Sequence, residues 1–349
     1  MGQIQQNNLT FLRFYLAFAV LVRHIIVLAD VDQLQALKPF FHTFFPSITT
    51  FFCISGFLTA RSFISSKSLK MFFEKRALRL LPSYLLMILF CVILLSFLST
   101  YSFKEYFSHP QLYKYLAANL TFMNFIQPCL PGVFIEENMV TCAVNGSLWT
   151  LKIEVMFYLL LPVLIFFTQK TKRKYLFFGA IYILSILYRN CLNYWGDISG
   201  NDTYYMLSRQ LPGFLSYFIC GVALNYYFDL FIKYKNILFF VGIGLFIIDK
   251  SIPFEFFKPL GLAMIVFSFA YSVKFLNSFG KYGDFSYGIY IYHFPLINIA
   301  TYLGFFERYN PFIVASAIVL IVLSVGFLSW NLVEKHFLAM VRSPKMKLK

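Results

Sequence analysis

Charged residues are scarce in this 349-residue chain, at 13% Asp, Glu, Lys and Arg where soluble domains have about 25%. Acids are scarcer than bases, with 15 Asp and Glu against 30 Lys and Arg, so the formal net charge is +15. Hydrophobic residues make up 59% of the chain, above the about 45–50% of soluble domains. This composition excludes a soluble enzyme, a disordered tail and a collagen-like fibre, and it predicts an integral membrane protein.

Several chemistry-bearing patterns are absent as well. No group of cysteines and histidines has the spacing of a zinc site, and neither a GxGxxG nor a P-loop nucleotide-binding motif is present. No internal repeat and no low-complexity segment stand out. We therefore expect no metal site, and the excess of basic residues needs an explanation in membrane topology or in nucleic-acid binding.

Apolar segments recur along the whole chain, and a helix needs about 20 such residues to cross the hydrocarbon core of a bilayer. One segment, residues 236–249, is shorter than this and is interrupted by Gly242 and Gly244. The predicted fold is therefore all-α, a polytopic membrane protein with about ten transmembrane helices. The ten segments are residues 9–28, 43–63, 80–99, 148–168, 175–193, 210–228, 236–249, 256–275, 285–304 and 312–332.

The positions of the charges predict the orientation of these helices. If both termini are cytoplasmic, the cytoplasmic segments carry 19 cations against 4 acids, and the outer segments carry 8 cations against 10 acids. This is the asymmetry of the positive-inside rule, which places Lys and Arg on the cytoplasmic side. Topology thus accounts for the basic charge, and nucleic acid is not needed as a partner.

One outer segment, residues 100–147, is too long to be a simple connection and is expected to form a cap or an acceptor-binding lid. It contains Cys129 and Cys142, which can form a disulfide in an oxidising compartment or remain two free thiols. The basic segment 334–349 is expected to be a cytoplasmic tail. We expect a single transmembrane domain over residues 1–349, with no appended soluble domain.

Ionisable residues inside predicted spans are candidates for function, because a charge in a bilayer is costly. The first span carries Arg13 and His24, eleven residues apart. A helix brings them to within about 20° of the same face and separates them by about 16 Å along its axis. They are either a functional polar stripe across the bilayer, or a snorkelling arginine and a histidine bonded to a backbone carbonyl.

Glu154 is the single acid in the interior of a predicted span, about 9 Å below the outer face at a depth similar to that of His24. A carboxylate there could orient the imidazole and stabilise its protonated form. The alternative is local pairing with Lys152 or with a tyrosine. Because Lys152, two residues away, points off the opposite side of the helix, a partner on another helix is favoured. His293, near the middle of a late span, is expected to be buried against its tyrosine neighbours.

Lys75, Arg76 and Arg79 cluster at the predicted inner membrane edge before the third span. Arg76 and Arg79 are three residues apart and share a helix face, so their two guanidinium groups could clamp a phosphate. The charges alone favour the simpler interpretation, in which basic residues at this edge set only the topology.

Five stretches of the chain match the motifs of one enzyme family in order and spacing. The first joins Arg13 to His24 as Arg-x10-His, and the second is Phe-Phe-Cys-Ile-Ser-Gly-Phe at 51–57. The others are Arg-Ala-Leu-Arg at 76–79, Ser-Leu-Trp-Thr-Leu-Lys-Ile-Glu at 147–154, and Ser-Tyr-Gly-Ile-Tyr-Ile-Tyr-His at 286–293. Over residues 7–335 the chain thus resembles the membrane-bound acyltransferase 3 family.

The resemblance implies a multi-pass enzyme of the bacterial cytoplasmic (inner) membrane, an O-acetyltransferase that uses cytoplasmic acetyl-CoA as its donor. The implied acceptor is a hydroxyl of a surface polysaccharide (O-antigen, capsule or exopolysaccharide) or of its lipid-linked precursor. His24 would be the catalytic base or form an acetyl-histidine, and Arg13 would hold the pantetheine arm or stabilise negative charge. Glu154 would orient His24. Arg76 and Arg79, with Lys75, would bind the coenzyme A phosphates.

Two features set the chain apart from the family pattern. The late Glu-x-Pro of many members is Glu334-Lys-His336 here, without the proline. The extra esterase-like domain of many relatives is not expected, because the chain stops at Lys349. A transporter or flippase for a lipid-linked sugar or acyl donor is the competing hypothesis, and the lack of internal repeats favours the enzyme.

Overall fold

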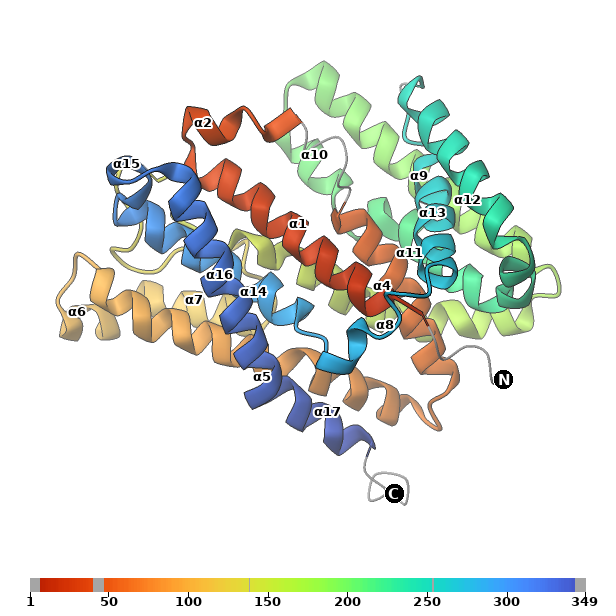
Figure 1. Cartoon of the computed structure of the whole chain (residues 1–349), viewed down its shortest axis with the longest axis horizontal. Helices are drawn as coiled ribbons and strands as arrows, with labels where there is room; N and C mark the ends of the chain where they lie inside the picture. The colour runs from red at the N-terminus through yellow and green to blue at the C-terminus, as the bar shows by residue number, and fades with distance from the viewer. Residues whose placement is uncertain (1–6, 40–46, 138, 253, 343–349) are drawn as a thin grey trace. The chain divides into compact units, whose positions relative to one another are not determined.

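The computed structural model describes residues 7–39, 47–137, 139–252 and 254–342. Over these residues every regular element is a helix and there is no strand (Figure 1). All-helical structure satisfies the backbone polar groups within each segment, as a hydrocarbon environment requires. The chain divides into two compact units, and the division falls inside the helices α1 (Leu9–Ala29), α5 (Leu69–Leu95) and α8 (Trp149–Lys170).

The first unit comprises Met1–Arg13, Ser47–Phe73 and Ile153–Lys281. Within it α11 packs against α4 and α9, and α12 lies beside α13 (Figure 1). Besides parts of the three shared helices, it contains α4 (Ser47–Ile64), α9 (Lys174–Ser199), α10 (Asp202–Ser208), α11 (Leu211–Tyr226), α12 (Phe228–Lys250) and α13 (Lys258–Ser272).

Two glycines bring α4 and α11 into backbone contact. A Cβ added to Gly56 would lie 2.0 Å from the carbonyl oxygen of Phe218, and one added to Gly221 would lie 2.0 Å from that of Cys53. No side chain fits at these distances, so glycine is required at both positions. The motif at 51–57 therefore serves helix packing in this unit, as small residues do between membrane helices.

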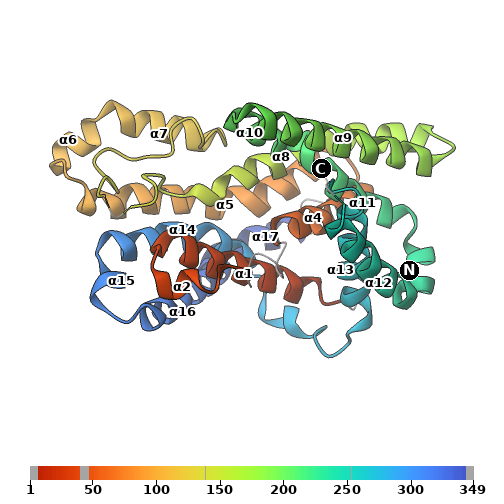
Figure 2. The ribbon, with the colours of Figure 1, turned by 90° about the horizontal axis from the view of Figure 1, so that it is seen from above.

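The second unit comprises Phe14–Pro46, Glu74–Lys152 and Tyr282–Lys349. Its central element is α14 (Ser286–Tyr302), which is buried along almost its whole length and packs along α16 (Pro311–Ser329) (Figure 2). Its other helices are α2 (Asp32–Gln35), α6 (Phe103–Ser108), α7 (Pro110–Leu120), α15 (Phe305–Arg308) and α17 (Lys335–Arg342), with short turns η2 (Ser96–Leu98) and η3 (Gly146–Leu148) and the π-helical turn η5 (Trp330–Glu334).

Over the residues that the structure describes, each of the ten predicted segments coincides with a helix; residues 43–46 of the second segment lie outside the described residues. In the described part of the chain six helices are long and apolar enough to cross a membrane, which establishes a multi-pass character. The remaining four, α4, α11, α13 and α14, have 15 to 18 residues each. The count of ten spans and the cytoplasmic location of the termini stay predictions.

The third predicted segment, 80–99, begins too late. Helix α5 starts at Leu69, so Lys75, Arg76 and Arg79 lie on the helix and not in a loop before it. Hydropathy alone misses this start, because Glu, Lys, Arg and Ala are polar or small yet have high helix propensity. The helical spacing does place Arg76 and Arg79 on one face, as predicted.

The long segment 100–147 has structure of its own, with α6 and α7 and a disulfide between Cys129 and Cys142. The disulfide alternative left open by the sequence is thus the one present. A backbone hydrogen bond from Val144 N to the Pro128 carbonyl lies next to it. Near the C-terminus, Glu334 is buried in η5, and α17 follows it directly. The expected tail 334–349 is therefore helical where it is described.

Candidate active site

Two histidines from distant parts of the chain meet in the second unit. His24 on α1 and His293 on α14 have their Nδ1 and Nε2 atoms 2.7 Å apart, and the two rings stack with centroids 4.9 Å apart. His293 is fully buried and packs against Tyr290, as expected from the sequence. His24 is partly exposed. The pair therefore joins a buried histidine to one that is accessible.

The hydrogen bonds fix which nitrogens carry protons when both rings are neutral. His293 Nδ1 lies 3.1 Å from the carbonyl oxygen of Ile289, which can only accept, so Nδ1 carries the proton. Nε2 of His293 is then an acceptor, and Nδ1 of His24 donates to it. The lone pair of His24 consequently lies on Nε2. This arrangement, a base oriented by a second group, is what general-base chemistry requires.

The segment before α8 holds α14 in place beside this pair. Pro295 lacks an N–H, so the Ile291 carbonyl four residues earlier has no donor within the helix. The side chain of Asn145 supplies one, with Nδ2 2.7 Å from that oxygen. Next to it, a Cβ on Gly146 would lie 2.7 Å from the Phe294 ring, which in turn contacts His24. The Asn-Gly-Ser sequence thus positions the residues around His293.

Arg79, one of the basic residues of α5, lies at the start of α14. Arg79 forms an ion pair with Asp284, whose other oxygen accepts a hydrogen bond of 2.6 Å from Ser286 at the start of α14. The Tyr287 hydroxyl donates to the Leu80 carbonyl at 3.0 Å. His293 follows Ser286 by seven residues, about 10 Å along the helix. Lys75 and Arg76 lie on α5 in the same unit and are partly buried.

Arg13 and Glu154 fall in the first unit. Arg13 is on α1, eleven residues before His24 on the same helix, and is partly buried. Glu154 on α8 accepts a hydrogen bond from the hydroxyl of Tyr158, one turn further along. This is the local tyrosine pairing that the sequence left open, and the Nδ1 atom of His24 is engaged by His293. The orienting role of Glu154 stays a prediction.

A polar pocket of about 290 Å³ lies at the end of α1 in the second unit. Its lining includes Asp30, Glu137 and Glu307, together with Thr301 of α14. Ala29, also in the lining, follows His24 by five residues, which is about 8 Å along the helix. Carboxylates and a hydroxyl are groups that hydrogen-bond to a polyhydroxylated molecule.

A model of the acyltransferase 3 family, described as an acyltransferase domain, matches residues 6–330 of the chain. The chain belongs to this family. Four of the five motifs of this acyltransferase contribute to the second unit, where His24, Arg79, Ser147 and His293 all contact or belong to α14 and the turn preceding it.

Two relatives align with nearly the whole acyltransferase. An "O-acetyl transferase" of Shigella phage Sf6 is 27% identical over 311 residues, which covers 86% of this chain and 87% of the relative. "Nodulation protein 10" of Rhizobium leguminosarum bv. viciae is 26% identical over an alignment covering 99% of this chain and 94% of the relative. No solved structure matches the chain.

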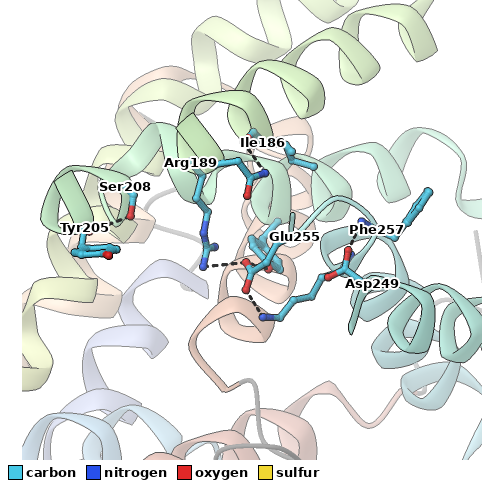
Figure 3. A network of polar contacts seen from close by, with 10 residues as sticks. Ile186, Arg189, Tyr205, Ser208, Asp249, Glu255 and Phe257 are labelled. Atoms are coloured by element: carbon cyan, nitrogen blue, oxygen red, sulfur yellow. Dashed lines mark hydrogen bonds and ion pairs between the residues drawn. The ribbon is translucent and has the colours of Figure 1, made fainter. Parts of the chain in front are cut away.

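Sequence reasoning did not foresee a second polar cluster, in the first unit (Figure 3). Glu255, between α12 and α13, is bound by Arg189 of α9 at 2.9 Å and by Lys258, while Asp249 accepts from the Phe257 N–H at 2.6 Å. Burial raises the pKa of Glu255, but the charges of Arg189 and Lys258 outweigh it and leave the pKa below its usual value. The cluster ties α9 to the α12–α13 connection, and only three-dimensional contact reveals it.

Proposed function

We propose that this acyltransferase moves an acetyl group from cytoplasmic acetyl-CoA to a hydroxyl of a surface polysaccharide or its lipid-linked precursor, in the inner membrane of a bacterium. Membership of the acyltransferase family supports the reaction class, and the name of the phage relative supports acetyl transfer to oxygen. One structural observation carries the proposal, namely the His24–His293 pair, which leaves a lone pair on His24 Nε2.

The donor would be recognised by charge. Coenzyme A carries phosphates, and the guanidinium and ammonium groups of Arg76, Arg79 and Lys75 on α5 can form charge-assisted hydrogen bonds with them. Arg79 forms an ion pair with Asp284 before the start of α14. We therefore assign it a second role, which is to hold α5 at a fixed position along α14, the helix that carries His293.

The acceptor would be recognised at the polar pocket near the end of α1. Its carboxylates can accept hydrogen bonds from several hydroxyls of a sugar at once, which suits a carbohydrate better than an apolar substrate. The pocket and the basic face of α5 both connect to α14, one through Thr301 and the other through the Arg79–Asp284 ion pair.

In the proposed step, His24 Nε2 takes the proton of the acceptor hydroxyl as its oxygen attacks the thioester carbonyl. The carbon–sulfur bond then breaks, and the coenzyme A thiolate leaves and receives the proton from His24. Such a base contributes typically 10²–10⁴ in rate. An acetyl-histidine intermediate is the alternative route, in which His24 Nε2 itself attacks first.

Arg13 and Glu154 retain the roles implied by their motifs. Arg13 would hold the pantetheine arm or stabilise the negative charge that develops on the carbonyl oxygen. Glu154, which accepts a hydrogen bond from Tyr158, would orient the imidazole of His24 and stabilise its protonated form. Substitution of each by an uncharged residue of similar size, Arg13→Gln and Glu154→Gln, tests them separately.

The test of the function uses the purified protein in lipid nanodiscs with acetyl-CoA labelled on the acetyl group. Wild type is expected to transfer label to hydroxyls of a glycan panel, in a form released by mild alkali as an ester is. A second assay in sealed vesicles measures movement of a lipid-linked sugar across the bilayer. Movement without any ester formation would replace the enzyme by the transporter hypothesis.

A further inference from the structure

An apolar groove of about 610 Å³ opens along the first unit between α9 and α12. Phe178 and Tyr182 of α9 form one wall, and Phe231 and Tyr234 of α12 form the other. Residues of α11 and α13, including Cys220, make the floor. The groove runs between helices that do not close against each other, and its lining is almost wholly hydrocarbon and aromatic.

The two wall helices, α9 and α12, are the least buried of the six long apolar helices. In its most apolar stretch α9 is 17% buried and α12 is 11% buried, whereas α1 and α5 are each 50% buried. Helices of this length and apolarity lie in the bilayer, so hydrocarbon chains surround this part of the protein. A water-filled groove with such a lining is unfavourable by about 25 cal/mol per Å² of apolar surface, and a hydrocarbon chain removes that penalty.

Two lysines lie close to the residues that line the groove. Phe178 packs its ring against Tyr226 and Tyr227 at the end of α11, which places the start of α9 beside the start of α12. Lys174 precedes Phe178 by one helical turn on the same face, and Lys233 lies over the Tyr234 ring at 5.1 Å. Both wall helices therefore carry a cation within their first two turns, next to tyrosine rings, as at a membrane interface.

We propose that this groove is a binding site for an anionic phospholipid. One acyl chain would lie between α9 and α12, and the phosphate would lie between Lys174 and Lys233. A basic pocket between transmembrane helices is the feature that binds anionic head groups on the cytoplasmic side. The two cations select a phosphate-bearing lipid over a neutral one, and the site is independent of the acetyl-transfer proposal.

Two glycines give a matched pair of variants for the test. Gly179 lines the groove, and an added Cβ there meets nothing within 4 Å. Gly244 on α12 has the same open surroundings and the same intermediate exposure but does not line the groove. Gly179→Leu should fill the groove without strain, while Gly244→Leu adds the same side chain elsewhere. Both replace glycine in a helix by a better helix former.

The experiment measures lipid bound to the detergent-purified full chain by native mass spectrometry, after titration with phosphatidylglycerol or phosphatidylcholine of equal chain length. Wild type and Gly244→Leu are expected to bind phosphatidylglycerol with the same affinity, and Gly179→Leu at least tenfold more weakly. Lys174→Gln and Lys233→Gln should each reduce the preference for phosphatidylglycerol about fivefold, since one cation near a lipid surface is worth about 1 kcal/mol.

Three outcomes would overturn the proposal. Equal binding by Gly179→Leu and wild type would show that the groove is not the site. Equal affinity of wild type for both lipids would remove the role of the cations. A polyprenyl phosphate that co-purifies and resists displacement by excess phosphatidylglycerol would assign the groove to a different lipid. Thermal unfolding of each variant shows that the comparison is made on folded protein.

Discussion

The two ring nitrogens of His24 differ in their surroundings, and this difference sets the proton chemistry open to the residue. Nδ1 is held by His293, whose own Nδ1 is held by the Ile289 carbonyl. A backbone carbonyl oxygen can only accept a hydrogen bond, so with both rings neutral His293 donates to Ile289 and His24 donates to His293. His293 therefore acts in our account as a positioning residue for His24.

Replacing His293 tests this role. In His293→Ala the orientation of His24 is lost, and we expect kcat to fall tenfold or more, though by less than the 10²–10⁴ attributed to a general base. KM for acetyl-CoA should stay the same, because His293 is fully buried. His293→Gln keeps an oxygen that accepts from His24 Nδ1 and should recover part of kcat. Steady-state kinetics over a range of pH would contradict the role if both variants kept the wild-type profile.

Arg76 and Arg79 share a helix face but have different neighbours, so their substitutions should differ. Arg76→Ala is expected to raise KM for acetyl-CoA several-fold, with a smaller effect at high salt because screening weakens phosphate contacts. Arg79→Ala also removes the ion-pair partner of Asp284, whose side chain is only 10% exposed, and should lower thermal stability as well.

Acetyl-CoA binding at two ionic strengths, together with thermal unfolding, separates the two effects. Lys67→Ala, a basic residue just before α5, provides the control for charge alone. Unchanged KM in Arg76→Ala at low salt would return the basic face to a role in topology only.

At the scale of elements, contacts between backbones decide how closely the helices pack. Gly56 of α4 and Gly221 of α11 face carbonyl oxygens at distances that exclude any side chain. In the second unit, Asn145 completes the hydrogen bonding of α14 where Pro295 interrupts it. Small residues and one amide thus fix the helices that carry the candidate site.

Gly221→Ala should separate α4 from α11 and lower the stability of the first unit. The added methyl would lie 2.0 Å from a backbone oxygen, so the helices have to move apart and lose contacts; overpacking of this kind costs typically 1–3 kcal/mol. Gly179→Ala, made in open space, is the matched control and should be neutral or slightly stabilising. Thermal unfolding in detergent compares them, and equal melting temperatures would contradict the close packing.

The sequence predicts the elements well and their contacts poorly. Within the described residues all ten apolar segments are helical, because hydropathy over about 20 residues reports directly on membrane-spanning helices. The early start of α5 was missed because its first turns are charged. The sequence proposed Glu154 as an orienting group for His24, which stays a prediction, and it did not foresee that His293 contacts His24 across 269 residues. Such a contact depends on the packing of α1 on α14, which no local pattern encodes.

At the scale of the whole molecule, the distribution of charge predicts how the chain lies in the bilayer. The disulfide between Cys129 and Cys142 agrees with an outer location of segment 100–147, since such bonds persist in oxidising compartments. Both arguments predict a cytoplasmic location for the basic residues around α5 and α9, the side on which acetyl-CoA would be found.

Labelling of single cysteines tests this orientation. In a background with Cys191 changed to Ser, Lys104→Cys is expected to react with a membrane-impermeant maleimide in intact cells. Lys172→Cys should react only after the cells are opened. Both native positions are exposed, so access is not limited by packing. The reverse pattern would overturn the predicted topology and the assignment of the donor to the basic side.

The rate of acetyl transfer by His24→Ala, measured with purified protein against His336→Ala as the control, tests the central claim most directly. His336 is exposed on α17 and takes no part in the pair. We predict that His24→Ala loses 10²-fold or more of the activity while keeping its melting temperature, and that His336→Ala retains it. A folded His24→Ala protein with a rate within twofold of wild type would contradict the account.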